Sequence, residues 1–239
     1  MPILEGEGVR KYFGGLAAVD HVDFSINRGE IVGLIGPNGA GKTTLFNLIS
    51  GSLVPTSGMI RFKDKTITGL KPHQICKRGI ARTFQLVKLF GEMTALENSM
   101  LGFLFGTRTG AEESKVKEAS LELLDFVGLS SMAKVLGREL TVANQKRLEV
   151  ARALATKPEL LLLDEVMAGL TPAEVAQATE LIRKIRDKGI TIFMIEHVMK
   201  AMMDISDRII VLHYGEKIAE GAPKEIAANT KVIEVYLGT

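Results

Sequence analysis

The strongest chemical pattern in the sequence is Gly36-Pro-Asn-Gly-Ala-Gly-Lys-Thr43, which fits G-x-x-x-x-G-K-[ST]. Glycines let a loop wrap closely around a phosphate, and successive backbone N–H groups supply positive potential. Lys42 would neutralise the terminal phosphates, and the hydroxyl of Thr43 would bind Mg²⁺. A glycine-rich turn could match by chance, but phosphate binding requires such a loop between a strand and a helix. The residues expected to contact a nucleotide here are Gly36, Pro37, Asn38, Gly39, Ala40, Gly41, Lys42, Thr43 and Thr44.

Two acids follow an apolar run in Leu160-Leu-Leu-Leu-Asp164-Glu165. Adjacent residues of an extended chain point in different directions, so Asp164 can face Mg²⁺ while Glu165 faces a water that attacks the γ-phosphate. Alone, a strand that ends in two acids is commonplace and more often structural. Together with a phosphate-binding loop in the same chain, it completes a metal and nucleotide site.

These residues need a layered α/β framework, and the hydrophobic pattern predicts one. The apolar run 31–35 reads as a strand before the loop, and residues 43–51 read as a helix after it. Residues 160–163 and 190–195 predict two more interior strands. Between them, Thr171-Pro-Ala-Glu174 predicts a helix start, with a Thr cap, Pro at the first helical position and Glu three residues after the cap.

Two regions differ from this alternation. Residues 19–26 and 58–62 predict an antiparallel β layer, whereas the region from about 86 to 156 is almost wholly helical in pattern, with helices over 111–127 and 144–156. We therefore expect one α/β domain over residues 1–239. Its P-loop NTPase core, with a mixed or parallel sheet flanked by helices and the N-terminal antiparallel β layer, would comprise residues 1–85 and 157–239. Residues 86–156 would form an inserted α-helical lobe.

Composition excludes several classes of protein. The 239 residues carry 30 Lys and Arg against 28 Asp and Glu, a net charge of +2 that argues against nucleic acid as a partner. No apolar stretch approaches the roughly 18 residues that spanning a membrane requires. The N-terminus lacks the pattern of a signal peptide, so we expect a cytoplasmic protein. A lone cysteine, Cys76, makes an internal disulfide impossible and zinc binding unsupported.

The segment from Arg138 to Leu154, just before the acidic strand, resembles the signature region of ABC transporter ATP-binding subunits. The order of motifs also resembles that family along essentially the whole chain: aromatic loop, phosphate loop, glutamine loop, signature helix, acidic strand and histidine loop. The resemblance implies ATP and Mg²⁺ as cofactors, and ATP hydrolysis coupled to transport. It also implies transmembrane permease subunits and a second ATP-binding subunit as partners, and a peripheral position on the inner face of the cell membrane.

The resemblance also gives roles to individual residues. Phe13 would stack on adenine, with Tyr12 as the competing candidate and a core aromatic as the alternative interpretation. Gln85, in Arg82-Thr-Phe-Gln85, would touch Mg²⁺ and the water and report to the membrane subunit. His197 would contact the γ-phosphate. The catalytic residues implied are Lys42, Gln85, Glu165 and His197, and the metal-binding residues are Thr43, Gln85 and Asp164.

Three other features bear on these assignments. Of the four histidines, only His197 is expected at a strand end on the catalytic edge of the sheet, whereas His21, His73 and His213 are expected to be surface or packing residues. Val166 stands where the family usually has Pro after the catalytic Glu. Residues 168–170 resemble the loop that links the two nucleotide sites of a dimer.

The signature itself departs from the family pattern. The usual Leu-Ser-Gly-Gly-Gln is replaced by Leu140-Thr-Val-Ala-Asn144. In the family this segment completes the partner's nucleotide site, so Thr141, Ala143 and Asn144 are expected to contact the partner's nucleotide. If position 143 needs a positive φ or a close backbone approach, the Cβ of Ala143 costs on the order of 1 kcal/mol. We therefore expect a dimer with unequal sites, and favour a heterodimer over a homodimer.

Four stretches resemble the branched-chain amino-acid uptake systems within this family: 79–98, 164–172, 195–200 and a C-terminal helix over 232–238. Urea, amide and lipid transporters of the same type would look much alike. Because of Ala143, a weakly hydrolysing regulatory subunit remains an alternative interpretation. A soluble cassette ATPase of DNA repair or translation would carry a second cassette or a long coiled-coil insertion, and this chain has neither.

Overall fold

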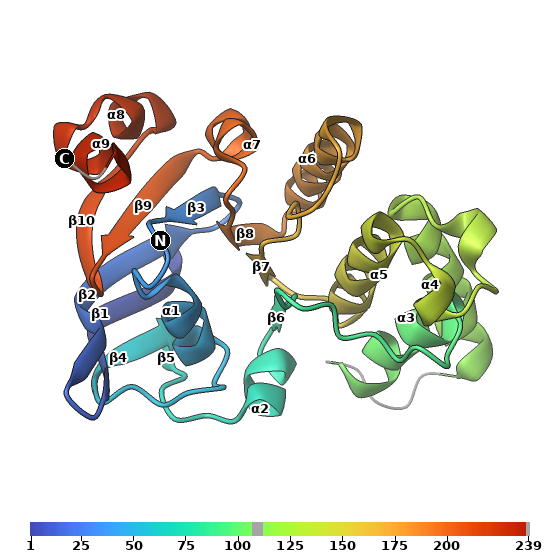
Figure 1. Cartoon of the computed structure of the whole chain (residues 1–239). Coiled ribbons are helices and arrows are strands. Elements are labelled where there is room, and N and C mark those ends of the chain that lie inside the picture. Colours follow the sequence, from blue (N-terminus) through green and yellow to red (C-terminus); the bar gives the residue numbers. More distant parts are fainter. Residues whose placement is uncertain (107–111, 238–239) are drawn as a thin grey trace.

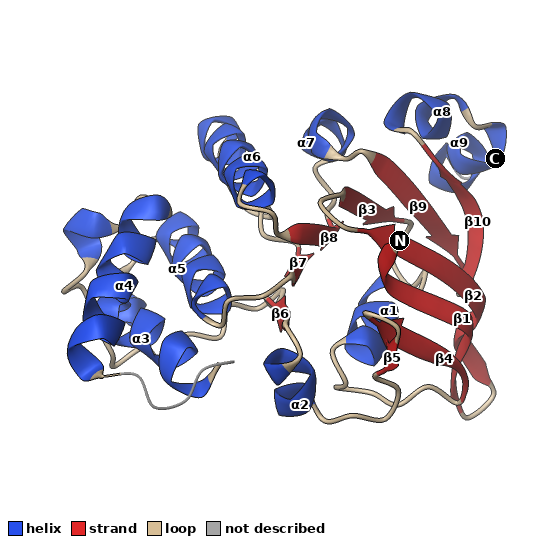
Figure 2. Cartoon of the chain, turned by 180° about the vertical axis from the view of Figure 1, so that it is seen from behind, coloured by secondary structure: helices blue, strands red, loops and turns tan. Residues whose placement is uncertain are grey.

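The computed structural model describes residues 1–106 and 112–237, and two β-sheets organise them (Figures 1 and 2). The larger sheet contains, in spatial order, β10 (Glu216–Gly221), β9 (Arg208–His213), β3 (Ile31–Ile35), β8 (Thr191–Ile195), β7 (Leu160–Asp164) and β6 (Ile80–Arg82). Only the β10–β9 pair is antiparallel in this sheet. Every residue of β3, β7 and β8 is buried, as expected of parallel strands covered on both faces.

The parallel strands bring their carboxyl ends to one edge of this sheet, which places distant motifs together. The phosphate loop follows β3, Asp164 ends β7, and Glu196 and His197 follow β8. His213 ends β9, which is parallel to β3. The expectation that His197 is the only histidine at a strand end on this edge is therefore wrong. The ring of His213 packs against that of Tyr214, with centroids 4.2 Å apart.

The second sheet is the antiparallel N-terminal layer predicted from the sequence. Its strands, in spatial order, are β2 (Leu16–Asn27), β1 (Pro2–Phe13), β4 (Ser57–Phe62) and β5 (Lys65–Thr66). Between the two sheets, Phe193 of β8 packs against Phe46 of α1 (Lys42–Ile49) and Phe24 of β2. This shared core fixes the start of α1, and with it the phosphate loop, against both sheets.

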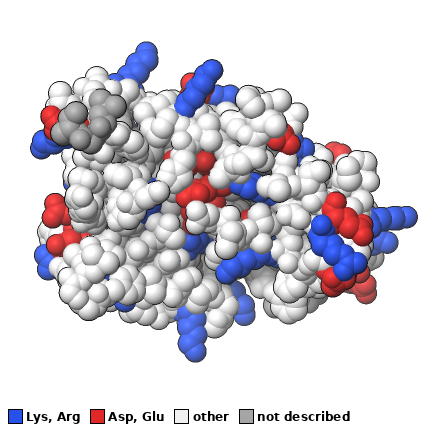
Figure 3. Space-filling view, viewed as in Figure 1, with Lys and Arg blue, Asp and Glu red and all other residues white. Residues whose placement is uncertain are grey.

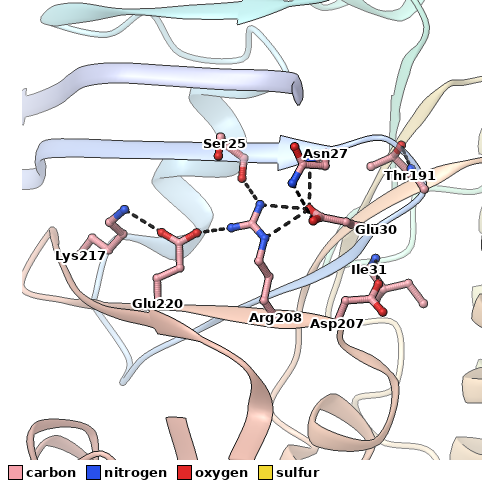
Figure 4. Close-up of polar contacts among 10 residues, drawn as sticks. Ser25, Asn27, Glu30, Ile31, Thr191, Asp207, Arg208, Lys217 and Glu220 are labelled. Carbon is pink, nitrogen blue, oxygen red and sulfur yellow. Dashed lines mark hydrogen bonds and ion pairs between the residues drawn. The ribbon is translucent and has the colours of Figure 1, made fainter. Parts of the chain in front are cut away.

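A polar cluster joins the edges of the two sheets (Figure 4). Arg208, at the start of β9, donates hydrogen bonds to the carbonyl of Ser25 in β2 and to the Oε2 atom of Glu30, and it pairs with Glu220 of β10. Glu30 in turn accepts hydrogen bonds from the backbone and the side chain of Asn27. One half-buried guanidinium therefore connects three strands.

Alternating residues of the central strands face two cores. One face packs against α1 and the N-terminal sheet. The other face packs against α6 (Pro172–Asp187) and α7 (Met199–Ile205). The predicted cap of α6 is present, because Thr171 and Glu174 exchange backbone-to-side-chain hydrogen bonds. The short helices α2 (Pro72–Lys77), α8 (Pro223–Ala228) and α9 (Thr230–Leu237) lie at the periphery (Figure 1).

Helices α3 (Ala95–Phe105), α4 (Glu113–Phe126) and α5 (Val142–Ala155) pack together to one side of both sheets, with short 3₁₀ turns at Ser130–Met132 and Gly137–Glu139 (Figure 2). The sequence predicts α4 from Ala111, which lies outside the described residues, as does Gly238 at the end of the predicted C-terminal helix. Helix α5 begins two residues before the predicted Asn144. Among the helices described, none is both long enough and apolar enough to cross a membrane.

Charge of both signs is distributed over the face that Figure 3 shows. Acidic side chains gather near its middle, and Lys and Arg side chains are scattered around them. On this side of the molecule, the nearly balanced charge of the sequence is therefore not separated into one basic and one acidic surface.

Candidate active site

The loop between β3 and α1 is held against neighbouring backbone, and this explains two of its glycines. Gly36 and Gly41 have φ values of 151° and 101°. A Cβ at Gly36 would lie 2.2 Å from the carbonyl oxygen of Leu212, and one at Gly41 would lie 2.3 Å from that of Ala18. Only glycine fits at either position, because both the conformation and the space exclude a side chain.

Lys42 lies inside this loop. Its Nζ atom donates hydrogen bonds to the carbonyl oxygens of Gly36 at 2.6 Å and Pro37 at 2.9 Å, and the residue is 7% exposed. Burial lowers the pKa of the ammonium group, while the nearby acids Glu165 and Asp164 act in the opposite direction. The loop therefore positions one ammonium group beside its own N–H groups, an arrangement suited to an anion with several phosphates.

A cavity of about 640 Å³ opens above the loop. Residues 38–44 form one side, and the β1–β2 turn with Phe13 forms another. Gln85, Glu165 and His197 also line it, so residues from widely separated parts of the chain share one cavity. This volume and the phosphate loop in its wall suit a ligand of the size of a nucleotide triphosphate.

Two of the predicted catalytic residues, Gln85 and His197, contact the carboxylate of Glu165. Its Oε2 atom accepts a hydrogen bond from Nε2 of Gln85 at 2.9 Å, and its Oε1 atom lies 3.0 Å from Nε2 of His197. Gln85 follows β6, Glu165 follows β7 and His197 follows β8. The three side chains therefore lie close together because these parallel strands are adjacent in the sheet. Glu165 itself has a φ of 52°, a conformation that few side-chain-bearing residues adopt.

Asp164 has the properties of a metal ligand with one free oxygen. Its Oδ2 atom pairs with Nη2 of Arg82 at 2.8 Å, whereas its Oδ1 atom is buried and has no hydrogen-bond partner among the described residues. Burial raises the pKa of Asp164, and the pairing with Arg82 opposes this. Oxygen atoms of Asp164, Thr43 and Gln85 are the type of ligand that Mg²⁺ prefers, so the residues present fit the predicted ion.

The structure separates the two aromatic candidates of the β1–β2 turn. Phe13 is 48% exposed and lines the cavity. Tyr12 donates a hydrogen bond from its hydroxyl to Oδ1 of Asp20 at 2.9 Å, and it does not line the cavity. Tyr214, which the sequence analysis did not consider, is a second aromatic side chain at the cavity wall and is 80% exposed.

The signature residues do not line this cavity. Thr141 caps α5, with its Oγ1 atom accepting a hydrogen bond from the backbone N–H of Asn144 at 3.4 Å, and Ala143 is buried in the first turn of the helix. Ala143 has a helical conformation rather than a positive φ, so the strain considered for its Cβ is absent here. Thr141 and Val142 are exposed at the helix end, where a second subunit could reach them.

Three residues near the site were missed by the sequence analysis: Arg82, Lys146 and Glu196. The side chain of Arg82 is 7% exposed, and Lys146 and Glu196 are 7% and 2% exposed as whole residues. Their only sequence signal is position, since each lies within a few residues of a recognised motif. Their contacts join residues far apart in the chain, which no local pattern reveals.

Comparison with known proteins identifies the family. Residues 19–168 match the family described as ABC transporter, and residues 216–239 match that described as branched-chain amino acid ATP-binding cassette transporter. The high-affinity branched-chain amino acid transport ATP-binding protein BraF of Pseudomonas aeruginosa is 42% identical over 250 residues, covering 99% of this chain and 98% of BraF. The corresponding protein LivG of Escherichia coli K12 gives the same identity and coverage. The probable LivG of Methanocaldococcus jannaschii is 35% identical over 252 residues, covering 100% of this chain and 98% of LivG.

Solved structures agree with this assignment and with the predicted α/β P-loop fold. A nucleotide-free ATP-binding cassette from an ABC transporter superposes with a TM-score of 0.92 at 34% identity over 100% of both chains. The ADP conformation of a cassette superposes at 0.91, with 35% identity and the same coverage. A dimeric cassette bound to ADP and phosphate superposes at 0.84, with 28% identity over 92% of this chain and 98% of the other. The chain belongs to the ATP-binding subunits of ABC transporters, and its last residues belong to the branched-chain amino acid ATP-binding cassette family.

Proposed function

We propose that this chain binds and hydrolyses ATP to power an ABC importer of branched-chain or other hydrophobic amino acids. The observation that carries the proposal is the convergence of Gln85 and His197 on the carboxylate of Glu165, at the end of a cavity that begins at the phosphate loop. The names of the relatives support the amino-acid substrate. The solute itself would contact other subunits of the transporter.

In the proposed mechanism, the loop N–H groups and Lys42 bind the phosphates and Phe13 stacks on adenine. Thr43, Asp164 and Gln85 would hold Mg²⁺, which when bound neutralises phosphate charge. Glu165 accepts a hydrogen bond from the attacking water, whose oxygen bonds to the γ-phosphorus and whose proton passes by way of the Glu165 carboxylate to the released phosphate. The bond from that phosphorus to the bridging oxygen breaks, and ADP leaves with this oxygen. His197 donates a hydrogen bond to the γ-phosphate, and so stabilises the charge that develops there.

We further propose that two such subunits close on two nucleotides, with Thr141, Ala143 and Asn144 touching the partner's nucleotide. The exposed start of α5 supports this, as does the dimeric state of a related cassette. The altered signature favours a heterodimer. The double change Ala143→Gly with Asn144→Gln should then raise phosphate release at the partner's site, measured in the assembled complex with Glu165→Gln silencing this chain's own site. An unchanged rate would contradict the proposal of unequal sites.

The permease is proposed to dock in an apolar groove of about 420 Å³ between α2, β6, α3 and α5. Its lining includes Phe84, Phe90 and Phe105, of which the last is 74% exposed. Phe84 is next to Gln85, so the groove is continuous with the segment that touches Glu165.

We propose that the helical lobe, residues 86–156, moves as a unit against residues 1–85 and 157–239. We also propose that the chain works in the cytoplasm, at the inner face of the membrane.

The experiment that tests the proposed function replaces Glu165 with Gln, which keeps the shape of the side chain but removes its charge. ATP should still bind, whereas phosphate release should fall by about 10²-fold or more, because Gln is a much weaker acceptor for the water. Glu180→Gln, on the exposed face of α6, is the matched control and should hydrolyse ATP as the unaltered chain does. Rapid hydrolysis by Glu165→Gln would refute the role of Glu165. ATP binding without hydrolysis by the unaltered chain, even with its partner subunits, would instead indicate a regulatory subunit.

A further inference from the structure

The turn that follows Glu165 is held by two charged side chains that lie outside the cavity. Lys146 projects from α5, and Glu196 follows β8 directly before His197. Both are nearly inaccessible, with exposed fractions of 7% and 2%. Burying a charged group is costly, so such residues are retained where their charge is used.

Both side chains bind the backbone of the turn at residues 165–168 rather than other side chains. The Nζ atom of Lys146 donates hydrogen bonds to the carbonyl oxygen of Glu165 at 2.8 Å and to that of Ala168 at 2.7 Å. The Oε1 atom of Glu196 accepts a hydrogen bond from the backbone N–H of Met167 at 2.7 Å. Three peptide groups of one short turn are therefore held by these two side chains. The two hydrogen bonds from the Lys146 ammonium group are charge-assisted, and such bonds are stronger than those between neutral groups.

The turn needs this support because its first residue is strained. Glu165 has a φ of 52°, in the left-handed region that residues with a Cβ rarely adopt because of steric strain. The next residue is Val166, which does not restrict the backbone as a proline does. Within the turn, the described backbone hydrogen bonds are Ala168 N–H to Glu165 at 3.3 Å and Leu170 N–H to Met167 at 3.2 Å, both long.

The backbone conformation at Glu165 decides where its carboxylate lies. The side chain contacts Gln85 at 2.9 Å and His197 at 3.0 Å, and a rotation of the backbone out of the left-handed region would move it away from both. Misplacement of a catalytic group by about 1 Å can lower a rate by about 10²-fold. Side chains that stabilise this turn are therefore expected to increase the rate of hydrolysis.

We propose that Lys146 and Glu196 act as a clamp on the turn at residues 165–168, and are positioning residues that aim the carboxylate of Glu165 for hydrolysis. The inference rests on the proposed function. Lys146 stands five residues after Thr141, the cap of the same helix. The clamp therefore joins the helix whose start is proposed to meet the partner's nucleotide to the catalytic acid of this chain's own site.

The test removes the hydrogen-bonding groups without shortening the side chains. Lys146→Met and Glu196→Met should each lower kcat for phosphate release by about 10-fold to 10²-fold, with the Kd for ATP changed by less than about threefold, since the phosphate loop is untouched. Lys146→Arg and Glu196→Gln keep a donor or an acceptor and should recover activity to within about threefold. Lys184→Met, which removes an exposed charge on α6, is the control for charge and should have no effect.

The outcomes separate the clamp from the proposed function. If Glu165→Gln abolishes hydrolysis but both methionine variants retain full kcat, the clamp is refuted and the proposed function stands. If kcat and ATP affinity fall together, or if Lys146→Arg is as slow as Lys146→Met, the role is structural and the clamp is refuted as well. If Glu165→Gln hydrolyses ATP normally, the proposed role of Glu165 fails. Should Glu196→Met not fold, Lys146→Met and Lys146→Arg decide the question, with folding checked by circular dichroism.

Discussion

The Nε2 atom of His197 lies 3.0 Å from the Oε1 atom of Glu165, although Glu165 follows β7 and His197 follows β8. The contact directs the imidazole into the cavity that the phosphate loop lines. His197 is largely accessible, with 46% of its side chain exposed, whereas only 12% of the Glu165 side chain is exposed. The histidine is therefore the more accessible member of the pair for a bound γ-phosphate, and the carboxylate is the member whose position the surrounding protein fixes.

Replacing His197 with Ala should lower kcat for ATP hydrolysis by about 10²-fold to 10³-fold, the effect of removing one donor to a developing charge. The Kd for ATP should change little, because the loop and Lys42, rather than His197, are proposed to bind the phosphates. Single-turnover phosphate release and equilibrium ATP binding measure the two quantities. His213→Gln is the control, since His213 ends β9 on the same edge of the sheet but packs against Tyr214. Equal losses in both histidine variants would contradict a specific role for His197.

Replacing Phe13 with Ala should weaken ATP binding by about 1–3 kcal/mol, the usual contribution of one base stacked on an aromatic ring. The exposed ring of Phe13 at the cavity wall is the reason for this expectation. Inorganic tripolyphosphate has no base and should bind Phe13→Ala as tightly as it binds the unaltered chain. Tyr12→Phe, which removes only the hydroxyl that binds Asp20, should bind ATP normally. If Phe13→Ala binds ATP as tightly as the unaltered chain, the assignment of Phe13 as the stacking residue is wrong.

Local patterns revealed the parts of the site that are continuous in the chain. The phosphate loop and the cap at Thr171 are defined by residues within eight positions of one another, so their geometry follows from residue type and spacing. His213 was misplaced because its strand, Arg208–His213, has only four interior apolar residues, and so short a run fits a buried helix or a strand equally well.

Contacts between distant segments could not be predicted in this way. Arg82 and Asp164 are 82 residues apart, and Lys146 reaches a turn whose last residue is 22 positions away. Their pairing depends on which strands become neighbours and on how α5 packs, and a single sequence does not specify either. The same holds for the backbone at Ala143, which lies in the first turn of α5 and has no positive φ.

Glu196 should make stability depend on pH. Burial raises its pKa from an ordinary value of 4.5 to about 7; the backbone N–H groups of Met167 and His197 and the charge of Lys146 oppose the rise, and Glu165 adds to it. Between these values the folded protein holds a proton that the unfolded chain has lost, so the free energy of unfolding falls as pH rises from about 4.5 to about 7. A shift of this size corresponds to a loss on the order of 3 kcal/mol.

Urea unfolding of the unaltered chain and of Glu196→Gln at pH 5 and pH 8 isolates this contribution, because other titrating groups are common to both. The unaltered chain should lose more stability than the variant over this range. Glu180→Gln, with an exposed side chain, should follow the unaltered chain. A parallel pH dependence of the unaltered chain and Glu196→Gln would show that Glu196 is ionised throughout the range.

Replacing Arg208 with Met should lower the free energy of unfolding by about 2–4 kcal/mol, since it leaves partly buried acids without their partner. Arg208 lies between Glu30 and Glu220 and pairs with both (Figure 4). Its side chain is 18% exposed, and those of Glu30 and Glu220 are 22% and 27% exposed. Burial acts to raise the pKa of Glu30, but hydrogen bonds from Asn27 and the pairing with Arg208 together lower it below its ordinary value. Without the guanidinium, two carboxylates and the carbonyl of Ser25 must find water at the junction of the sheets.

Arg186→Met provides the matched control for Arg208→Met. Arg186 pairs with Asp187 at 3.2 Å and with Asp207 at 3.9 Å on the surface, and such exposed pairs contribute about 0–1 kcal/mol. Urea unfolding at neutral pH should therefore separate the two variants by more than about 1 kcal/mol. Because Arg208 joins the N-terminal sheet to β9, its loss should also increase hydrogen exchange in β2 and at the β1–β2 turn, which carries Phe13. Equal stability of the two variants, with unchanged exchange in β2, would mean that the core around Phe193 alone holds the sheets together.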